Sequence, residues 1–184
     1  TTYYYKAKAV NSAGISNGNA LDALPSYQWD LNDTGSIAED FRGLADGQIT
    51  GANSAWDANK SSNVLTFDGT DDFISFGDLD EMDQIDRFTF SIWFKRTSDT
   101  SSTPTNHGVH NVLLGQSSGG SNDNLEIGTN GSNVQLYVDS GSAETDATVT
   151  FDAGLVNDRW YHLAVVYGSE LSLFLDGVKI STWT

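Results

Sequence analysis

Two acidic, glycine-containing stretches of the chain offer oxygen ligands to a hard cation. They are residues 40–47, which read Asp-Phe-Arg-Gly-Leu-Ala-Asp-Gly, and residues 68–72, which read Asp-Gly-Thr-Asp-Asp. Calcium takes about six to eight oxygens from carboxylates and backbone carbonyls, and glycine lets the backbone turn its carbonyls inward. Aspartate also favours turns through local hydrogen bonds, without any ion. The two stretches therefore predict either a calcium site or ordinary turns.

Aromatic and planar polar residues could form a carbohydrate surface, because sugars are held by ring faces together with polar side chains. Tyr137 lies in an alternating stretch on the same side as Gln135 and opposite Leu136, which predicts that it is exposed. Exposed aromatic residues that bind nothing are also common. The predicted carbohydrate-binding residues are Trp56, Tyr137, Asn106, His107, His110, Asn122 and Asp123.

The three histidines raise two further questions: whether two of them bind a transition metal and whether the third lies in the core. His107 and His110 are spaced to chelate a transition metal from one loop, but the sequence shows no third ligand, and a solvated loop is the alternative. His162 alternates with Trp160 and Ala164, which predicts a histidine whose polar atoms are satisfied in the core.

Catalytic patterns are weak in this sequence. Glycoside hydrolysis needs two carboxylates placed across a sugar, and the nearest match is the acidic run at residues 78–83, between two predicted strands. The placement of the histidines nominates no Ser-His-Asp triad. We expect a protein that is not an enzyme.

Composition limits the class of protein and of partner. The chain has 184 residues, 38% of them hydrophobic, no cysteine and a net charge of −16. Such a charge repels nucleic acid and anionic lipid surfaces, and no apolar run approaches the ~20 residues that span a bilayer. We expect neither nucleic-acid binding nor membrane insertion. The absence of cysteine excludes disulfides. It does not indicate a cytoplasmic location, because a core of this size is stable without disulfides.

Short alternating segments bounded by Gly, Asn or Asp predict strands along the whole chain. Asn130-Gly131 and Asp176-Gly177 predict hairpin turns, and residues 97–111 predict a polar loop. The predicted strands are residues 27–31, 47–52, 63–68, 73–76, 87–96, 112–115, 125–128, 134–138, 148–151, 160–167, 171–175 and 178–180.

Two stretches resemble the laminin-G-like, concanavalin A-like jelly-roll family: residues 65–76 with 88–95, and residues 159–167 with 173–177. The resemblance implies an all-β, antiparallel β-sandwich over residues 25–184, with Trp93 and Trp160 in its core. It also implies a calcium site, since residues 40–47 resemble an acidic loop of the family. The implied calcium ligands are Asp40, Gly43, Asp46, Asp71 and Asp72.

The two ends of the chain resemble parts of larger modules. Residues 1–24, with a tyrosine-rich strand and a second strand at Ile15-Ser16, resemble the last two strands of a fibronectin type III domain. After Asp176-Gly177, laminin-G-like domains usually continue into strands that close the sandwich. We therefore expect a sandwich that lacks its closing C-terminal strands, which would leave a sheet edge unpaired.

These observations predict a non-catalytic, calcium-dependent module that binds a glycan or glycoprotein. It would serve adhesion within a larger extracellular, secreted or cell-surface protein, beside neighbouring modules of the same chain. Two alternatives stay open: an accessory binding module of an extracellular polysaccharide-degrading enzyme, or a purely structural spacer or fibre module.

Overall fold

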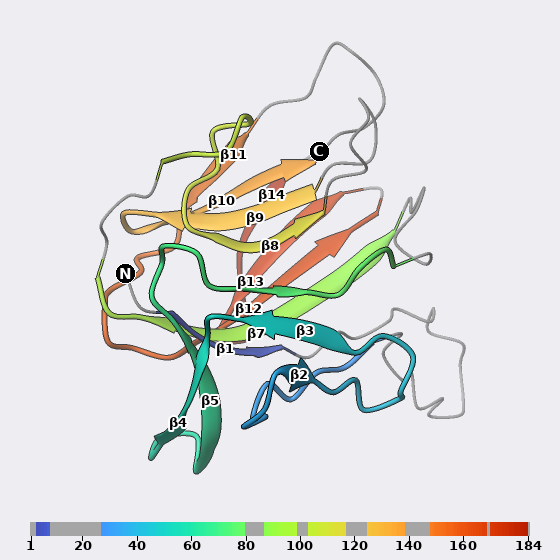
Figure 1. The fold of residues 1–184 in the computed structure, drawn as a ribbon. Helices are drawn as coiled ribbons and strands as arrows, with labels where there is room; N and C mark the ends of the chain where they lie inside the picture. Colours follow the sequence, from blue (N-terminus) through green and yellow to red (C-terminus); the bar gives the residue numbers. More distant parts are fainter. Residues whose placement is uncertain are drawn as a thin grey trace, which may run out of the picture. The chain divides into compact units, whose positions relative to one another are not determined.

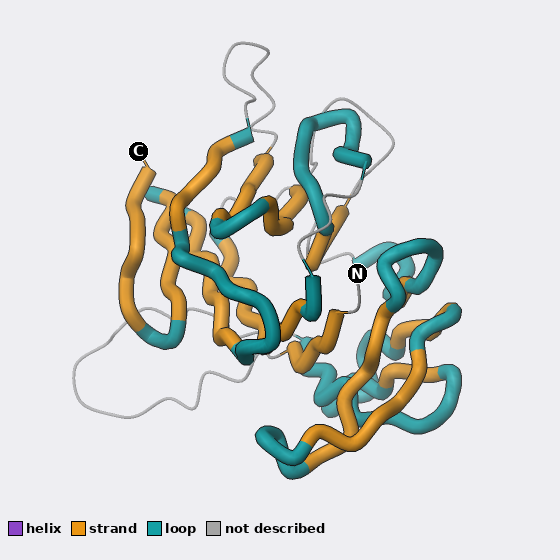
Figure 2. The backbone as a smooth tube through the Cα atoms, turned by 90° about the vertical axis from the view of Figure 1, so that its left-hand side faces the viewer, coloured by secondary structure: helices purple, strands orange, loops and turns teal. Residues whose placement is uncertain are grey.

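The computed structural model describes residues 3–7, 27–79, 87–98, 103–116, 125–138, 148–168 and 170–183. Figure 2 shows that this part of the chain consists of strands and loops, and it contains no helix that could cross a membrane. The strands are β1 (Tyr3–Ala7), β2 (Ile37–Ala38), β3 (Gly47–Thr50), β4 (Asn53–Asp57), β5 (Ser62–Phe67), β6 (Phe73–Ser75), β7 (Phe88–Arg96), β8 (Val112–Gln116), β9 (Leu125–Asn130), β10 (Asn133–Val138), β11 (Val149–Asp152), β12 (Tyr161–Tyr167), β13 (Leu171–Leu175) and β14 (Val178–Trp183).

Figure 1 shows the strands, which form three sheets. The chain divides into two compact units. Thr1–Arg96 with Arg159–Thr184 holds a seven-stranded sheet of order β14-β13-β12-β7-β1-β5-β4 and a three-stranded sheet of order β2-β3-β6. Thr97–Asp158 holds a four-stranded sheet of order β11-β10-β9-β8. All the pairings are antiparallel. The prediction of an all-β, antiparallel fold of the β-sandwich, jelly-roll type is confirmed.

Strand alternation separates the two faces of the seven-stranded sheet. Phe94 of β7 pairs with Tyr161 of β12, and these two side chains are buried together with Leu163. Burying a large apolar side chain contributes about 1.5–3 kcal/mol, so this face stabilises the unit. On the opposite face, Trp93 pairs with His162.

The N-terminal strand β1 lies between β5 and β7 in the seven-stranded sheet, and its register pairs Tyr5 with Leu65 and with Phe94. The second strand predicted at Ile15-Ser16 and the predicted boundary after residue 24 lie outside the described residues. The fibronectin-like assignment of residues 1–24 therefore stays a prediction.

Most predicted strands are present with ends shifted by at most three residues, but three regions differ. Residues 27–31 form only an isolated bridge between Trp29 and Asp40. Leu31 has a φ of 51°, so an extended strand cannot continue through it. The short strand β2 and the polar edge strand β4 were not predicted. Polar sequence at a sheet edge carries little of the apolar alternation that identifies strands.

The two predicted hairpins also differ from each other. Asp176 and Gly177 both have positive φ, at 51° and 80°, and join β13 to β14 as a two-residue turn. In the other hairpin Asn130 pairs with Asn133, so the turn consists of Gly131 and Ser132, one residue later than predicted. Gly131, with a φ of 61°, takes the first central position, where a type II′ turn requires glycine.

Candidate functional site: the tryptophan–lysine cluster

The polar face of the seven-stranded sheet carries a cluster of aromatic and charged side chains. Alternation along β7 puts Trp93 and Lys95 on the face opposite the buried Phe94. Trp93 pairs with His162 of β12, and the two ring centroids lie 5.0 Å apart. Both side chains are half-buried. These adjacent strands thus present an aromatic pair that solvent reaches.

The end of β4 and the turn after it add two charged residues to this face. Lys95 Nζ lies 2.6 Å from Asp57 Oδ2. Lys60 Nζ lies 3.1 Å from the ring centroid of Trp93 and 4.7 Å from that of Trp160. Lys95 Nζ lies 5.2 Å from the centroid of Trp160. We define the tryptophan–lysine cluster as Asp57, Lys60, Trp93, Lys95, Trp160 and His162.

Asp57 fixes the turn that carries Lys60. Its Oδ1 accepts hydrogen bonds from the backbone N–H of Asn59 at 2.9 Å and of Lys60 at 3.2 Å. Aspartate favours turns through such contacts with the backbone just ahead of it. The other carboxylate oxygen, Oδ2, accepts a hydrogen bond from Lys95 Nζ. One side chain therefore holds the turn and anchors a lysine of the neighbouring strand.

The environment of the cluster moves two pKa values. Burial by itself would raise the pKa of Asp57, but the hydrogen bond and charge of Lys95 and the Asn59 amide outweigh it, so this pKa lies below its usual value. Burial lowers the pKa of His162; the charge of Asp176 opposes this and the charge of Lys60 adds to it. At neutral pH Asp57 is an anion and His162 is neutral, so the cluster offers hydrogen-bond donors and acceptors beside ring faces.

Of the two predicted aromatic platforms, one is exposed and one is buried. Trp56, on β4, has 68% of its surface exposed, as a binding platform requires. Tyr137 is only 7% exposed, so the prediction that it is exposed is wrong. The ring of His107 stacks on it with centroids 4.0 Å apart and planes 3° apart. Alternation placed Tyr137 on the polar side of β10 as expected, but a loop covers that side.

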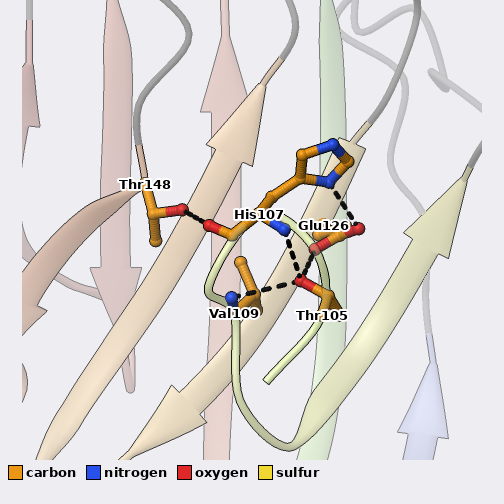
Figure 3. A network of polar contacts seen from close by, with 5 residues as sticks. All are labelled: Thr105, His107, Val109, Glu126 and Thr148. Carbon is orange, nitrogen blue, oxygen red and sulfur yellow. Dashed lines mark hydrogen bonds and ion pairs between the residues drawn. The ribbon is translucent and has the colours of Figure 1, made fainter.

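A hydrogen-bond network holds this loop in place (Figure 3). His107 Nδ1 lies 2.8 Å from Glu126 Oε1, and Thr105 Oγ1 donates to Glu126 Oε2 at 2.5 Å. Thr105 Oγ1 also accepts from the backbone N–H of Val109 at 3.2 Å, and Thr148 donates to the carbonyl of His107. These hydrogen bonds attach the loop to the four-stranded sheet.

Two other residues of the predicted carbohydrate site, His110 and Asn106, belong to this same loop. The backbone N–H of His110 donates to Gln135 Oε1 at 2.9 Å, and Asn106 is exposed in the same loop. Among the described residues, neither histidine belongs to a group of three side chains close enough to share a metal ion. Asn122 and Asp123 lie outside the described residues.

Asp40 and Asp46 organise their own loop. The nearly buried carboxylate of Asp40 accepts the backbone N–H of Gln28 at 2.8 Å and of Leu44 at 2.9 Å. Asp46 Oδ1 accepts the N–H of Asp40 at 2.9 Å, and Gly43 turns the chain with a φ of 66°. Burial would raise the pKa of Asp40, but these backbone donors outweigh it and lower that pKa. These hydrogen bonds are of the kind that the turn interpretation predicts, and the calcium interpretation of this stretch stays a prediction.

The second acidic stretch brings three carboxylates together. Oxygens of Asp68, Asp71 and Asp72 all lie within 4.8 Å of one another. Asp72 Oδ2 accepts the N–H of Asp68 at 2.8 Å, and Asp68 Oδ1 accepts the N–H of Thr70 at 2.7 Å. Neither Asp40 nor Asp46 belongs to this group, so the implied calcium set divides between two places. Three carboxylates would supply part of a calcium shell.

Sequence reasoning did not select the tryptophan–lysine cluster. Trp93, Trp160 and His162 were predicted in the core, whereas all three are half-buried, with Trp93 and His162 on the polar face. The alternation of Trp93 with Phe94, which puts Trp93 beside Lys95, was the available signal. No pattern pointed to Asp57, at the end of the edge strand β4, or to Lys60, in the turn after it, because their partners lie on distant strands.

Comparison with known proteins identifies part of the chain. A laminin-G family model, described as the concanavalin A-like lectin/glucanases superfamily, matches residues 68–184, which is more than half of the chain. Comparison with curated proteins gave no match, and neither did comparison with solved structures.

Proposed function

The chain belongs to the concanavalin A-like lectin/glucanase superfamily, and we propose that it is a non-catalytic carbohydrate-binding module whose binding face is the tryptophan–lysine cluster. The observation that carries this proposal is the position of Trp93 and Trp160 beside Lys60, within 4.7 Å of its ammonium group. Indole faces suit the C–H faces of sugars, and nearby donors and acceptors suit their hydroxyls. The superfamily is compatible with such a role.

The chemistry of the cluster favours binding over catalysis. Its one carboxylate, Asp57, is 7% exposed and paired with Lys95, and its lowered pKa makes it a poor proton donor. A glycosidase acid instead needs a raised pKa. Hydroxyl recognition by Asp57, Lys60 and His162 requires no proton transfer.

Isothermal titration with soluble polysaccharides, after a screen on a glycan array, tests the site. Trp93→Ala should lower affinity roughly tenfold or more, because a stacked aromatic carries much of a binding energy. Phe41→Ala is a matched control, since Phe41 is 78% exposed and outside the cluster. Trp56→Ala tests the alternative platform. If Trp56→Ala abolishes binding and Trp93→Ala leaves it intact, the cluster is not the site; uniform background on all glycans refutes the function.

Calcium dependence is a separate part of the proposal. The charge of −16 and the carboxylates of Asp68, Asp71 and Asp72 support a cation at residues 68–72. Millimolar calcium should raise the melting temperature relative to chelator, because a ligand that binds the folded state stabilises it. Asp71→Asn should remove that shift. Equal melting temperatures with calcium and with chelator would refute the calcium site.

The setting of the module is also proposed. We infer an extracellular role beside other modules of a longer secreted or cell-surface protein, where glycan binding would serve adhesion or would concentrate an attached enzyme on its polysaccharide. A structural spacer is the remaining alternative, and it predicts no glycan binding at all.

A further inference from the structure

The indole rings of Trp93 and Trp160 hold an ammonium group that belongs to the protein itself. Lys60 Nζ lies 3.1 Å from the ring centroid of Trp93 and 4.7 Å from that of Trp160, and both rings are half-buried. The quadrupole of a ring attracts a cation over its face, and that of tryptophan does so most strongly. The two rings are therefore a place that binds an ammonium group, and Lys60 fills it.

This contact places Lys60 in competition with a ligand. At 3.1 Å from the centroid, its ammonium covers a face of the Trp93 ring. A ligand can use that face only in those molecules in which the lysine has moved away, and its apparent affinity falls in proportion to their fraction. The competition follows from the ring contact alone, whatever further contacts the lysine side chain makes.

The position of Lys60 in a turn lets its side chain leave the rings. Asp57 Oδ1 accepts the backbone N–H of Lys60 at 3.2 Å, so the backbone of the turn is held independently of the ammonium group. A lysine side chain is a flexible four-carbon stem. Rotation about its own bonds is enough to uncover the ring, and no strand has to move.

The surroundings favour a cation in the place that Lys60 leaves. The other charged pair of the cluster, Lys95 and Asp57, is matched at 2.6 Å and so contributes no net charge. The whole chain carries a net charge of −16, and such an excess raises the local concentration of cationic ligands. A positively charged group is therefore the ligand that both the rings and the chain attract.

We propose that the rings of Trp93 and Trp160 bind the protonated amino group of an amino sugar, and that Lys60 is an internal competitor which this group replaces. This inference rests on the proposed carbohydrate-binding function and names its ligand class, which is saccharides that contain unacetylated amino sugars. The family match does not supply the competitor, because Lys60 precedes residue 68, where the match begins.

Titration of the full chain with a matched pair of ligands tests this selectivity. The pair is a glucosamine oligosaccharide and its fully N-acetylated form, measured at a slightly acidic pH at which the amino groups are protonated. High ionic strength screens the general attraction between an acidic chain and a cationic ligand. We expect the amino form to bind roughly fivefold more tightly, because only this form makes the cation–π contact. Trp93→Ala should remove the preference.

Variants of Lys60 test the competition. Lys60→Ala removes the internal ammonium and should bind the amino form roughly fivefold more tightly than the native chain does. Lys60→Arg should bind it as the native chain does, because a guanidinium also stacks on aromatic faces. Lys179→Ala is the control for net charge, since Lys179 is exposed on β14 outside the cluster. Melting temperatures check that each variant is folded.

The ring of His162 reports where the amino group binds. Burial lowers the pKa of His162, and the charge of Lys60 lowers it further, so Lys60→Ala should raise this pKa. Saturation of Lys60→Ala with the amino form should lower the pKa again, because the ligand puts a positive charge back beside the ring. The acetylated form should not have this effect. NMR titration of the His162 ring measures both changes.

The outcomes separate the two proposals. Equal or tighter binding of the acetylated form overturns the selectivity for amino sugars while carbohydrate binding stands. A preference that survives in Trp93→Ala overturns the role of the rings, and a Lys60→Ala affinity no higher than that of Lys179→Ala overturns the competition. If neither oligosaccharide binds and the glycan array is also blank, carbohydrate binding fails and this inference fails with it.

Discussion

Each compact unit places a histidine against an aromatic side chain, but the two pairs differ in what solvent reaches. Trp93 and His162 are 5.0 Å apart with a 45° tilt, and both are half-buried; we call them the open pair. His107 and Tyr137 are 4.0 Å apart and nearly parallel, and Tyr137 is 7% exposed; they are the closed pair. His162 comes from an adjacent strand, whereas His107 comes from a loop fastened to Glu126. Cover by a loop, more than side-chain type, decides which of the two aromatic rings solvent reaches.

The largest effect is expected when the ion pair beside the open pair is broken. Lys95→Met leaves the Asp57 carboxylate, 7% exposed, without its counter-charge. Breaking such a buried pair costs about 3 kcal/mol of the free energy of unfolding. Urea denaturation at neutral pH measures this loss.

Two further variants control this experiment. Lys179→Met removes an exposed charge and should change stability by less than about 0.5 kcal/mol. The double variant Asp57→Asn/Lys95→Met should recover part of the loss, since no uncompensated charge remains. If Lys95→Met and Lys179→Met are equally stable, the ion pair does not anchor the open region.

Much of the fold follows from sequence because alternation reports directly which way a strand residue points. Trp93 lies opposite Phe94, and Tyr137 shares its face with Gln135, as the period-two pattern requires. Alternation does not report whether a residue on the polar side of a strand is buried by another segment. The sequence around Tyr137 does not indicate His107, which lies thirty positions away. His107 stacks on Tyr137 only when hydrogen bonds hold its loop in place.

The candidate site was harder to predict for the same reason. Asp57, at the end of an edge strand, pairs with Lys95, and Lys60, in the turn that follows, lies over Trp93. These partners lie at sequence separations that no local pattern encodes. The loop of Asp40 shows the same limit: its acidic composition predicts an ion or a turn, and only the structure shows that Asp40 accepts the backbone N–H of Gln28 and of Leu44. Composition indicates which functional groups are present, whereas tertiary contacts decide which partners those groups have.

A smaller effect is expected when the cover of the closed pair is released. Glu126→Ala removes the acceptor of His107 Nδ1 and of Thr105 Oγ1. Leaving these groups without their partner should cost about 1–2 kcal/mol. Amide exchange of His107, Val109 and His110 should then become faster, because the loop opens more easily.

Asn106→Ala is the matched control in that loop, since Asn106 is exposed, and it should change neither stability nor exchange. Unchanged exchange in Glu126→Ala would mean that Glu126 does not hold the cover. The closed state of Tyr137 would then have another cause.

The smallest expected effect is a pH dependence specific to the open pair. Burial lowers the pKa of His162 below its ordinary 6.5, with Asp176 opposing and Lys60 adding to the shift. The folded state therefore holds fewer protons than the unfolded state just below pH 6.5, so the stabilisation present above that pH is lost as the pH falls through the folded pKa. Asp57 and Asp40 titrate below 3.8, outside this window. Melting temperatures between pH 7.5 and 5 should fall less in His162→Gln than in the native chain. An NMR titration of the His162 ring checks the direction, and a midpoint above 6.5 would contradict the proposed environment of the open pair.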